Sequence, residues 1–370
     1  MSFASFASSQ ALAWRLSRQL LDPVGTEPVE EVVRRLGAVQ AQHGWAAELS
    51  IRTRRQQSEA GEVARARAEG RLIMTFAFRG ATHLMTPEDG GVYLALRAAS
   101  RQWELKSWRE YYGLEPSDWP ALHETVREAL ASGPLTVNEL VAAIAARPKF
   151  AHLGPILSGN PWSVMKALTW HGDMSFGPAK GKQSTFQRLD DIPRWAGVPD
   201  LDDAGVRAVE HYLRWYGPAT PANLQYWLGE GLSAGRKRVQ GWTGRLGDRL
   251  AEIEVDGQAS YVLREDLEEL AAALPSTVVR LLPAYDQWFL GAGTADVRIV
   301  PPARRELVSR GASVVIVGGV VTGTWTLADD DITIDWFPAS GRAPGDALEG
   351  EVDRLAGILD RSLRVAVKAA

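Results

Sequence analysis

The 370-residue sequence predicts an α+β protein made of repeated units, each with three helices and a β-hairpin, followed by a small β-rich domain. Helical runs of apolar residues end at Gly133-Pro134 and again at Gly217-Pro218, and two short strand-like runs follow each set of helices. After residue 276 the pattern changes to closely spaced β-branched runs, which is typical of a small sheet or barrel.

The composition is ordinary for a globular protein, with 45% apolar and 23% charged residues. No apolar run reaches the roughly 18 residues of a membrane span, and the N-terminus lacks the basic and apolar regions of a signal peptide. The absence of cysteine excludes disulfides, thiolate metal sites and a cysteine nucleophile. We therefore expect a cytoplasmic protein with no membrane partner. The net charge of −4 does not by itself indicate nucleic-acid binding.

The N-terminal part is predicted as a first, irregular unit, in which Arg79-Gly80 turns a hairpin. A single long helix over 86–111, rich in Arg and Trp, is expected to connect it to the next unit. The helices of the first unit are expected at 10–21, 28–38 and 61–70, and its strands at 72–78 and 82–85.

The second unit is the clearest. Thr136 and Glu139 have the spacing of a capping box at the start of its second helix, and Asn160-Pro161 opens its third. The hairpin tip carries Lys180 and Lys182, which suit a phosphate backbone, although a solvated turn has the same composition. The helices are expected at 118–131, 137–146 and 162–171, and the strands at 173–176 and 184–189.

A third unit repeats this order. Its third helix is expected to be capped by Ser233, and Asp256-Gly257 is a strong two-residue hairpin signal. In the C-terminal domain, Gly318-Gly319 and Asp329-Asp330 are expected to be turns, and three consecutive aspartates are not expected to bind a metal. The predicted elements are helices at 202–216, 221–228, 233–246 and 348–359, and strands at 249–255, 259–264, 313–317, 320–327, 331–337 and 362–367.

Three helices followed by a hairpin is the order of a winged helix. The sequence therefore predicts three tandem winged-helix motifs and a small C-terminal β-barrel. The expected domains are 1–116, which includes the connecting helix, then 117–192, 193–275 and 276–370.

Gln40 and Gln42 are the most informative pair of residues. They follow a predicted helix, and their side chains share one side only if the backbone is extended there. Two carboxamides on one side form a neutral site that accepts and donates hydrogen bonds and could hold a water molecule. Surface glutamines are common, so a functional interpretation of the pair depends on other segments of the chain.

Several short segments extend from the first fifty residues to beyond residue 320, and each alone is weakly specific. They are Gln40-Ala41-Gln42, Arg79-Gly80-Ala81-Thr82-His83, Phe176-Gly177-Pro178, Phe186 to Leu189, Leu281 to Asp286 and Gly323-Thr324-Trp325. Taken together, these segments resemble the AlkZ/AlkX (YcaQ) winged-helix DNA glycosylases.

The resemblance implies three winged helices and a barrel in a C shape that holds duplex DNA. The motif has glutamine at both ends, as in the AlkZ branch, whereas the AlkX branch has Gln-x-Asp. The resemblance also implies hydrolysis of the N-glycosidic bond of alkylated purines, including bulky adducts and interstrand crosslinks, with Gln40 and Gln42 as catalytic residues. In some relatives this gives self-resistance to a DNA-alkylating antibiotic. We expect a nucleoid-associated monomer that needs no cofactor or metal.

Besides the wing lysines, several side chains are candidates for DNA contact; they are Trp45, Arg52, Arg54, Arg79 and His83. Each has a structural alternative: the arginines could form a solvated face, and His83 could be a structural hairpin residue. Two other functions stay open at this point. One is a non-enzymatic winged-helix DNA-binding protein or transcriptional regulator, and the other is a family member that has lost activity.

Overall fold

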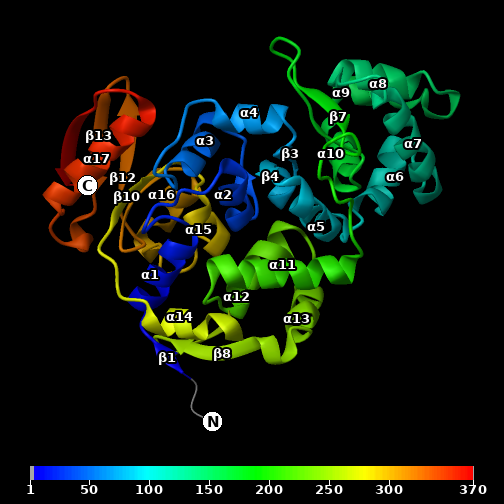
Figure 1. The fold of residues 1–370 in the computed structure, drawn as a ribbon. Coiled ribbons are helices and arrows are strands. Elements are labelled where there is room, and N and C mark those ends of the chain that lie inside the picture. Colours follow the sequence, from blue (N-terminus) through cyan, green and yellow to red (C-terminus); the bar gives the residue numbers. More distant parts are fainter. Residues whose placement is uncertain (1–3, 370) are drawn as a thin grey trace. The chain divides into compact units, whose positions relative to one another are not determined.

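A computed structural model describes residues 4–369, which fold into two compact units (Figure 1). Unit 1 comprises the described residues up to Val63, the segment Val209–Trp227 and the residues from Thr243 onward. Unit 2 comprises Ala64–Ala208 and Leu228–Trp242. The chain passes between the units several times, so neither unit is one continuous segment.

The C-terminal part of unit 1 is an open five-stranded sheet, so the predicted closed barrel is wrong. The strand order is β10-β11-β12-β13-β14, and within the described chain the two outer strands do not pair with each other. Neighbours are antiparallel except for β13 and β14, which are parallel. The strands are β10 (Val279–Leu282), β11 (Ser313–Val317), β12 (Val320–Ala328), β13 (Asp331–Trp336) and β14 (Arg364–Ala369).

Helices cover both faces of this sheet, which explains why it stays open. On one face Leu348, Val352 and other residues of α17 (Gly345–Leu359) pack with Val315. Val314 and Ile316 point to the opposite face, because strand side chains alternate, and there they pack with α1 (Ser8–Arg18) and α15 (Gln287–Ala292). Each face thus buries its apolar side chains against helices, and the sheet need not curl around its own core.

The predicted two-residue hairpin turns are confirmed. Gly318-Gly319 connects β11 to β12, and both glycines have positive φ, at 54° and 91°. Asp329-Asp330 connects β12 to β13. Asp256-Gly257 connects β8 (Leu250–Val255) to β9 (Gln258–Leu263), with φ of 45° and 76°. Two consecutive positive φ values are characteristic of the type I′ turn that matches strand twist.

This β8–β9 hairpin gains a third strand that the sequence pattern did not predict. The short strand β1 (Ser5–Phe6) pairs with β8 in parallel. Helix α1 packs on the hairpin through Trp14, together with Leu270 of α14 (Leu267–Ala272). The N-terminal helix is therefore buried between the hairpin and the C-terminal sheet, both of which lie in unit 1.

The second predicted winged-helix repeat, residues 117–192, has its helices and hairpin strands in the predicted order. The capping box is confirmed: the Thr136 hydroxyl accepts from the Glu139 N–H, and the Glu139 carboxylate accepts from the Thr136 N–H. The short helix α9 (Leu153–Gly159) is additional. The other helices of this repeat are α7 (Trp119–Leu130), α8 (Val137–Ala145) and α10 (Trp162–Trp170). Its sheet has the order β5-β7-β6, formed by Leu135–Thr136, Thr185–Arg188 and Met174–Phe176.

The first predicted winged-helix repeat, residues 1–116, departs most from the prediction. Helix α3 (Gly44–Arg52) was not predicted, because after Trp45 all of its residues except Glu48 are buried and no amphipathic period is visible. The predicted connecting helix is two helices, α5 (Pro87–Ala98) and α6 (Lys106–Tyr112), interrupted at Arg101, which has φ of 46°. The remaining elements are α2 (Val29–Leu36), β2 (Val39–Gln40), α4 (Glu62–Ala68), β3 (Ile73–Phe76) and β4 (Thr82–Met85).

The third set of helices begins as predicted with α11 (Leu201–Tyr216). Its second helix, α12 (Pro221–Leu224), runs into a π-helical segment over Gln225–Gly231. The expected start at Ser233 is wrong. Ser233 has φ of 61° and Gly235 has φ of 85°, which is incompatible with a helix, so α13 begins at Arg236 (Arg236–Gly244).

Candidate active site around Gln40 and Gln42

Both motif glutamines are accessible. Gln40 ends strand β2 and is half-buried, whereas Gln42 is exposed on the bend that leads into α3. Among the described residues, neither carboxamide has a hydrogen-bond partner from the protein. The backbone is extended through Gln40 and then bends, so the predicted extended conformation covers only the first part of the motif. Both amides are thus free to bind a substrate or a water molecule.

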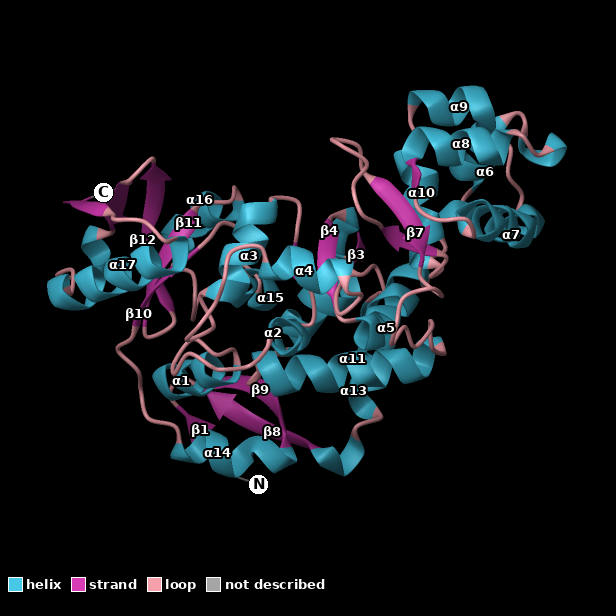
Figure 2. Cartoon of the chain, turned by 45° about the horizontal axis from the view of Figure 1, so that its top comes forward, coloured by secondary structure: helices cyan, strands magenta, loops and turns pink. Residues whose placement is uncertain are grey.

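A buried ion pair fixes the helix that follows the motif. Arg54, just beyond the end of α3, donates two hydrogen bonds to Asp286, 2.8 Å to Oδ2 and 2.7 Å to Oδ1. Both side chains are 0% exposed. Ser50 donates a third bond to Asp286 Oδ2 at 2.6 Å, and Asp286 also caps α15 by accepting from the Trp288 N–H. Figure 2 shows α3 beside α15, the two helices that this carboxylate joins.

Arg52 and Arg54 were expected to contact DNA, but the structure buries both side chains. Arg54 is enclosed, and its guanidinium is committed to Asp286 and to the Ser50 carbonyl. Arg52 is also buried; it donates to the Ile358 carbonyl and to the Ser58 hydroxyl. Both guanidinium groups are hydrogen-bonded within the support of the motif, because a charged side chain inside a protein needs polar partners. This expectation is corrected.

Aromatic contacts extend from the motif into the C-terminal sheet. His43 stacks on Tyr285, with ring centroids 5.6 Å apart and planes 10° apart. Trp45 meets Trp325 edge to face at 6.4 Å, and the Trp325 indole donates to the Leu282 carbonyl. The segments Leu281 to Asp286 and Gly323 to Trp325 thus act through contact with α3 and its N-terminal loop. The pattern marked these segments without revealing a role for any of their residues.

An open cleft of about 770 Å³ lies beside Trp45. Trp325, Ser313 and Thr326 contribute to its walls, and Asp335 and Arg361 bring charge to it. Trp45 is 54% exposed, the largest exposure of any tryptophan among the exposed apolar side chains of the described chain. Trp45 thus lines an open cleft, whereas its contact with DNA stays a prediction.

The wing candidates lie in unit 2. Lys180 forms an ion pair with Glu139 at 3.0 Å, and both side chains are half exposed. The Thr136 N–H and then Lys180 lower the pKa of Glu139 to about 2. Lys182 is exposed at the tip between β6 and β7, and no partner for its ammonium is found within the described part of the chain. Lys182 is therefore the wing residue that is free to contact phosphate.

The two remaining candidates for DNA contact, Arg79 and His83, lie in the β3–β4 hairpin and differ in exposure. Arg79 is exposed at the turn, with φ of 51°. His83 is 3% exposed, and its Nδ1 bonds the Ala81 carbonyl at 3.0 Å. Burial lowers the pKa of His83 to about 4, so the imidazole is neutral at pH 7. A direct contact of His83 with DNA is corrected to a structural role, and Arg79 stays a prediction.

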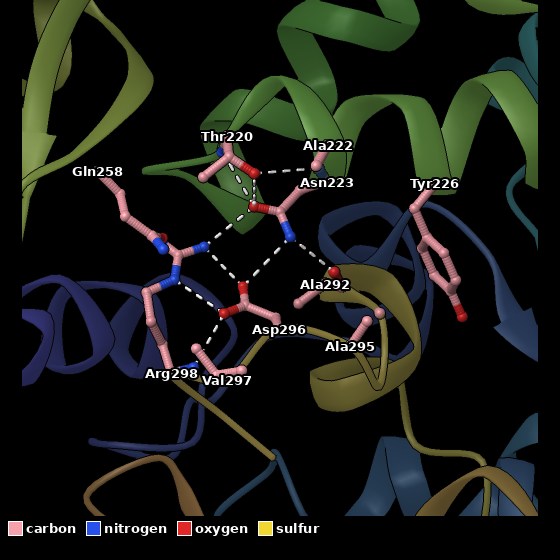
Figure 3. Close-up of a pocket in the computed structure, with 11 residues that line it drawn as sticks. Thr220, Ala222, Asn223, Tyr226, Gln258, Ala292, Ala295, Asp296, Val297 and Arg298 are labelled. Carbon is pink, nitrogen blue, oxygen red and sulfur yellow. Dashed lines mark hydrogen bonds and ion pairs between the residues drawn. The ribbon is translucent and has the colours of Figure 1, made fainter. Parts of the chain in front are cut away.

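A second polar pocket, of about 350 Å³, has a structural explanation (Figure 3). Arg298 donates to both oxygens of Asp296 and to the Asn223 carboxamide oxygen. The Asn223 NH2 donates to the Ala292 carbonyl and to Asp296. These groups satisfy one another, and the network joins α12 to the segment after α15.

We expect Asn223→Ala to destabilise the protein by about 1–3 kcal/mol, because the Arg298 donor and the Ala292 carbonyl lose their partner in the interior. Urea unfolding measures the change. Asn160→Ala, at an exposed helix end, is the matched control and is expected to be neutral. Equal midpoints for the two variants would contradict the structural role of the network.

The described residues lack two other kinds of feature. No helix within residues 4–369 is long and apolar enough to cross a bilayer. In the same part of the chain, no group of three His, Asp or Glu side chains is arranged to hold a metal ion. The exposed Asp331 next to the Asp329-Asp330 turn instead pairs with Arg364.

Comparison with known proteins identifies the family. Residues 33–358 match the family model described as DNA glycosylase AlkZ-like. The chain is 36% identical, over 369 residues, to an interstrand DNA cross-link repair glycosylase of Streptomyces sahachiroi, covering 96% of this chain and 98% of that protein. The solved structure of the S. sahachiroi DNA glycosylase AlkZ matches with a TM-score of 0.93 and 34% identity, covering 98% of this chain and 100% of the other. The chain belongs to the AlkZ-like DNA glycosylase family and is an enzyme that acts on N-glycosyl bonds.

Proposed function

We propose that this glycosylase hydrolyses the N-glycosidic bond of N7-alkylated purines in duplex DNA, with Gln40 and Gln42 as its catalytic residues. The observation that carries the proposal is the pair of accessible carboxamides, which have no partner among residues 4–369, beside a loop and helix held by a buried ion pair. The alternative of a DNA-binding protein without enzymatic activity is not favoured, because the family is one of glycosylases.

The chemistry explains why neutral side chains suffice. Alkylation at N7 makes the purine cationic, so it leaves as a neutral base when the bond between C1′ and the base nitrogen breaks and the electron pair goes to the base. Positive charge then develops on the sugar. The carbonyl oxygens of Gln40 and Gln42 stabilise this charge as fixed dipoles and orient a water molecule. The water oxygen bonds to C1′, and its proton passes to solvent.

Water is the proposed nucleophile because the segment offers no amine. The sequence has no lysine before Lys106, and the segments that form unit 1 contain a single lysine, Lys368 in β14. A lysine amine would be needed to form a Schiff base with C1′. We therefore propose a monofunctional enzyme that leaves an abasic site. We also propose that it needs no cofactor or metal and works as a monomer.

Bulky adducts and interstrand crosslinks belong to the proposed substrates. The S. sahachiroi relative is named for interstrand cross-link repair, and the similarity to this chain covers nearly the full length of both proteins. The open cleft beside Trp45 provides room for groups larger than methyl near the motif. Self-resistance to a DNA-alkylating natural product would use the same activity.

The direct test uses a duplex oligonucleotide with one N7-methylguanine. The enzyme is expected to release the free base and to leave a strand that breaks only after alkali treatment. A duplex with a neutral lesion such as hypoxanthine is expected to react far more slowly, because its base is a poorer leaving group. No release of N7-methylguanine, or strand cleavage that borohydride traps as a covalent complex, would overturn the proposal.

The proposed wing contact predicts a change in salt dependence. Lys182→Ala is expected to reduce the slope of log K against log salt by about 0.9, because one fewer counterion is released when duplex DNA binds. Fluorescence anisotropy with undamaged duplex at several salt concentrations measures the slope. Lys106→Ala is the matched control, since Lys106 already pairs with Glu110 on α6. Identical slopes for wild type and Lys182→Ala would exclude the contact.

A further inference from the structure

Trp45 is exposed, whereas most residues of its helix are buried. It is the second residue of α3, and more than half of its surface is accessible, whereas Ala46, Ala47 and Leu49 lie in the interior. An exposed indole has a large apolar face that water solvates poorly, and such a side chain next to a motif is suited to contact a ligand. Its sole aromatic contact in the described chain is the edge-to-face contact with Trp325, and more than half of its surface stays open to a ligand.

The two tryptophans form a corner of the cleft. The Trp45 and Trp325 planes meet at 75°, so one ring provides a face and the other an edge. Trp325 is 2% exposed, and its indole N–H is held by the Leu282 carbonyl, so this wall is rigid. Ser313, Thr324 and Thr326 add hydrogen-bonding groups to the lining. An apolar corner with a few polar groups is the usual form of a small-molecule site.

The cleft lies within reach of the proposed catalytic residues. Trp45 is three residues beyond Gln42, a separation of at most about 11 Å between Cα atoms. A second connection runs through His43, which stacks on Tyr285, whose ring lies against Gly311 at the cleft wall. A group attached to a purine whose sugar is at Gln40 and Gln42 could therefore extend into the cleft.

We propose that this cleft binds the substituent that alkylation adds to the purine, and that it prefers a planar aromatic substituent. The inference rests on the proposed function and adds a specificity determinant to it. At about 770 Å³ the cleft is far larger than a methyl group and within the usual range for small-molecule sites. The aromatic corner stabilises a ring by stacking, and the openness of the cleft lets a bulky adduct enter without a tight base pocket.

The test compares two substrates with each variant. One duplex carries N7-methylguanine, and the other carries guanine alkylated at N7 with a polycyclic aromatic group. Trp45→Ala is expected to lower kcat/KM for the aromatic adduct by about 5- to 150-fold, the range for loss of one stacking contact. Excision of N7-methylguanine is expected to fall less, so the ratio of the two kcat/KM values is the readout; a contact of Trp45 with the DNA itself would lower both values equally. Trp45→Phe should recover most of the discrimination, because it restores an aromatic face.

Two more variants complete the test. Trp162→Ala removes another exposed tryptophan, in unit 2, and is expected to leave the ratio of the two rates unchanged. Thr326→Trp fills the cleft from β12 and is expected to slow excision of the aromatic adduct selectively. If Trp45→Ala and Thr326→Trp each affect both substrates equally, or neither, the cleft proposal is wrong while the glycosylase proposal stands. If the wild type excises neither lesion, the proposed function itself fails.

Discussion

Replacing Gln42 or Gln40 by alanine is expected to slow excision of N7-methylguanine by about 100- to 1,000-fold, the typical cost of removing one oriented dipole from a site of developing charge. The binding of undamaged duplex should change little, because neither carboxamide carries charge. Single-turnover rates at saturating enzyme isolate the chemical step from product release.

The matched control for these variants is Gln57→Ala. Gln57 is also an exposed glutamine, but it lies in the loop after α3. This variant should retain the wild-type rate. Equal single-turnover rates for wild type, Gln40→Ala and Gln42→Ala would refute the catalytic assignment. Gln42→Asp is expected to retain activity on the cationic lesion, because a carboxylate also stabilises positive charge on the sugar.

The second large effect is expected at the ion pair under the motif. Asp286→Ala leaves the Arg54 guanidinium buried without its partner, which typically costs about 3–5 kcal/mol in unfolding free energy. Ser50 and the α15 N-terminus lose their acceptor as well. Urea unfolding, followed by fluorescence, measures the loss. The folded fraction should also excise more slowly, since α3 is then less firmly held.

A double variant distinguishes an uncompensated charge from a general packing defect. Arg54→Met combined with Asp286→Leu removes both charges and is expected to be more stable than Asp286→Ala alone, because no buried ion is left unpaired. Asp331→Ala breaks an exposed pair with Arg364 and should leave the midpoint unchanged. If Asp286→Ala were as stable as Asp331→Ala, the support role would be excluded.

Local signals predicted much of the fold. The capping box at Thr136, the Asp256-Gly257 turn and the Gly318-Gly319 turn depend on residues close in sequence, and all three are confirmed. The errors involve partners far apart. Strand β1 pairs with β8 across nearly 250 residues, and no feature of Ser5–Phe6 indicates that partner. The open sheet was mistaken for a barrel because strand patterns do not show which helices cover the faces.

The sequence indicated the candidate motif but not the residues that support it. Gln40 and Gln42 stood out from their spacing and from resemblance, and their accessibility is consistent with that prediction. Arg54 was misassigned because an arginine-rich stretch usually lies at the surface, and its partner Asp286 is 232 residues away. Trp325 and Tyr285 were visible as parts of matching segments, yet their contacts with Trp45 and His43 depend on the tertiary fold.

The pairing of Arg54 with Asp286 also bears on synthesis of the enzyme at the ribosome. A nascent polypeptide that has not reached residue 286 contains both glutamines but lacks the carboxylate that anchors the following helix. Premature termination before that point, or proteolytic loss of the distal quarter, would leave Arg54 without its partner. The anchored form of the helix therefore requires translation past residue 286.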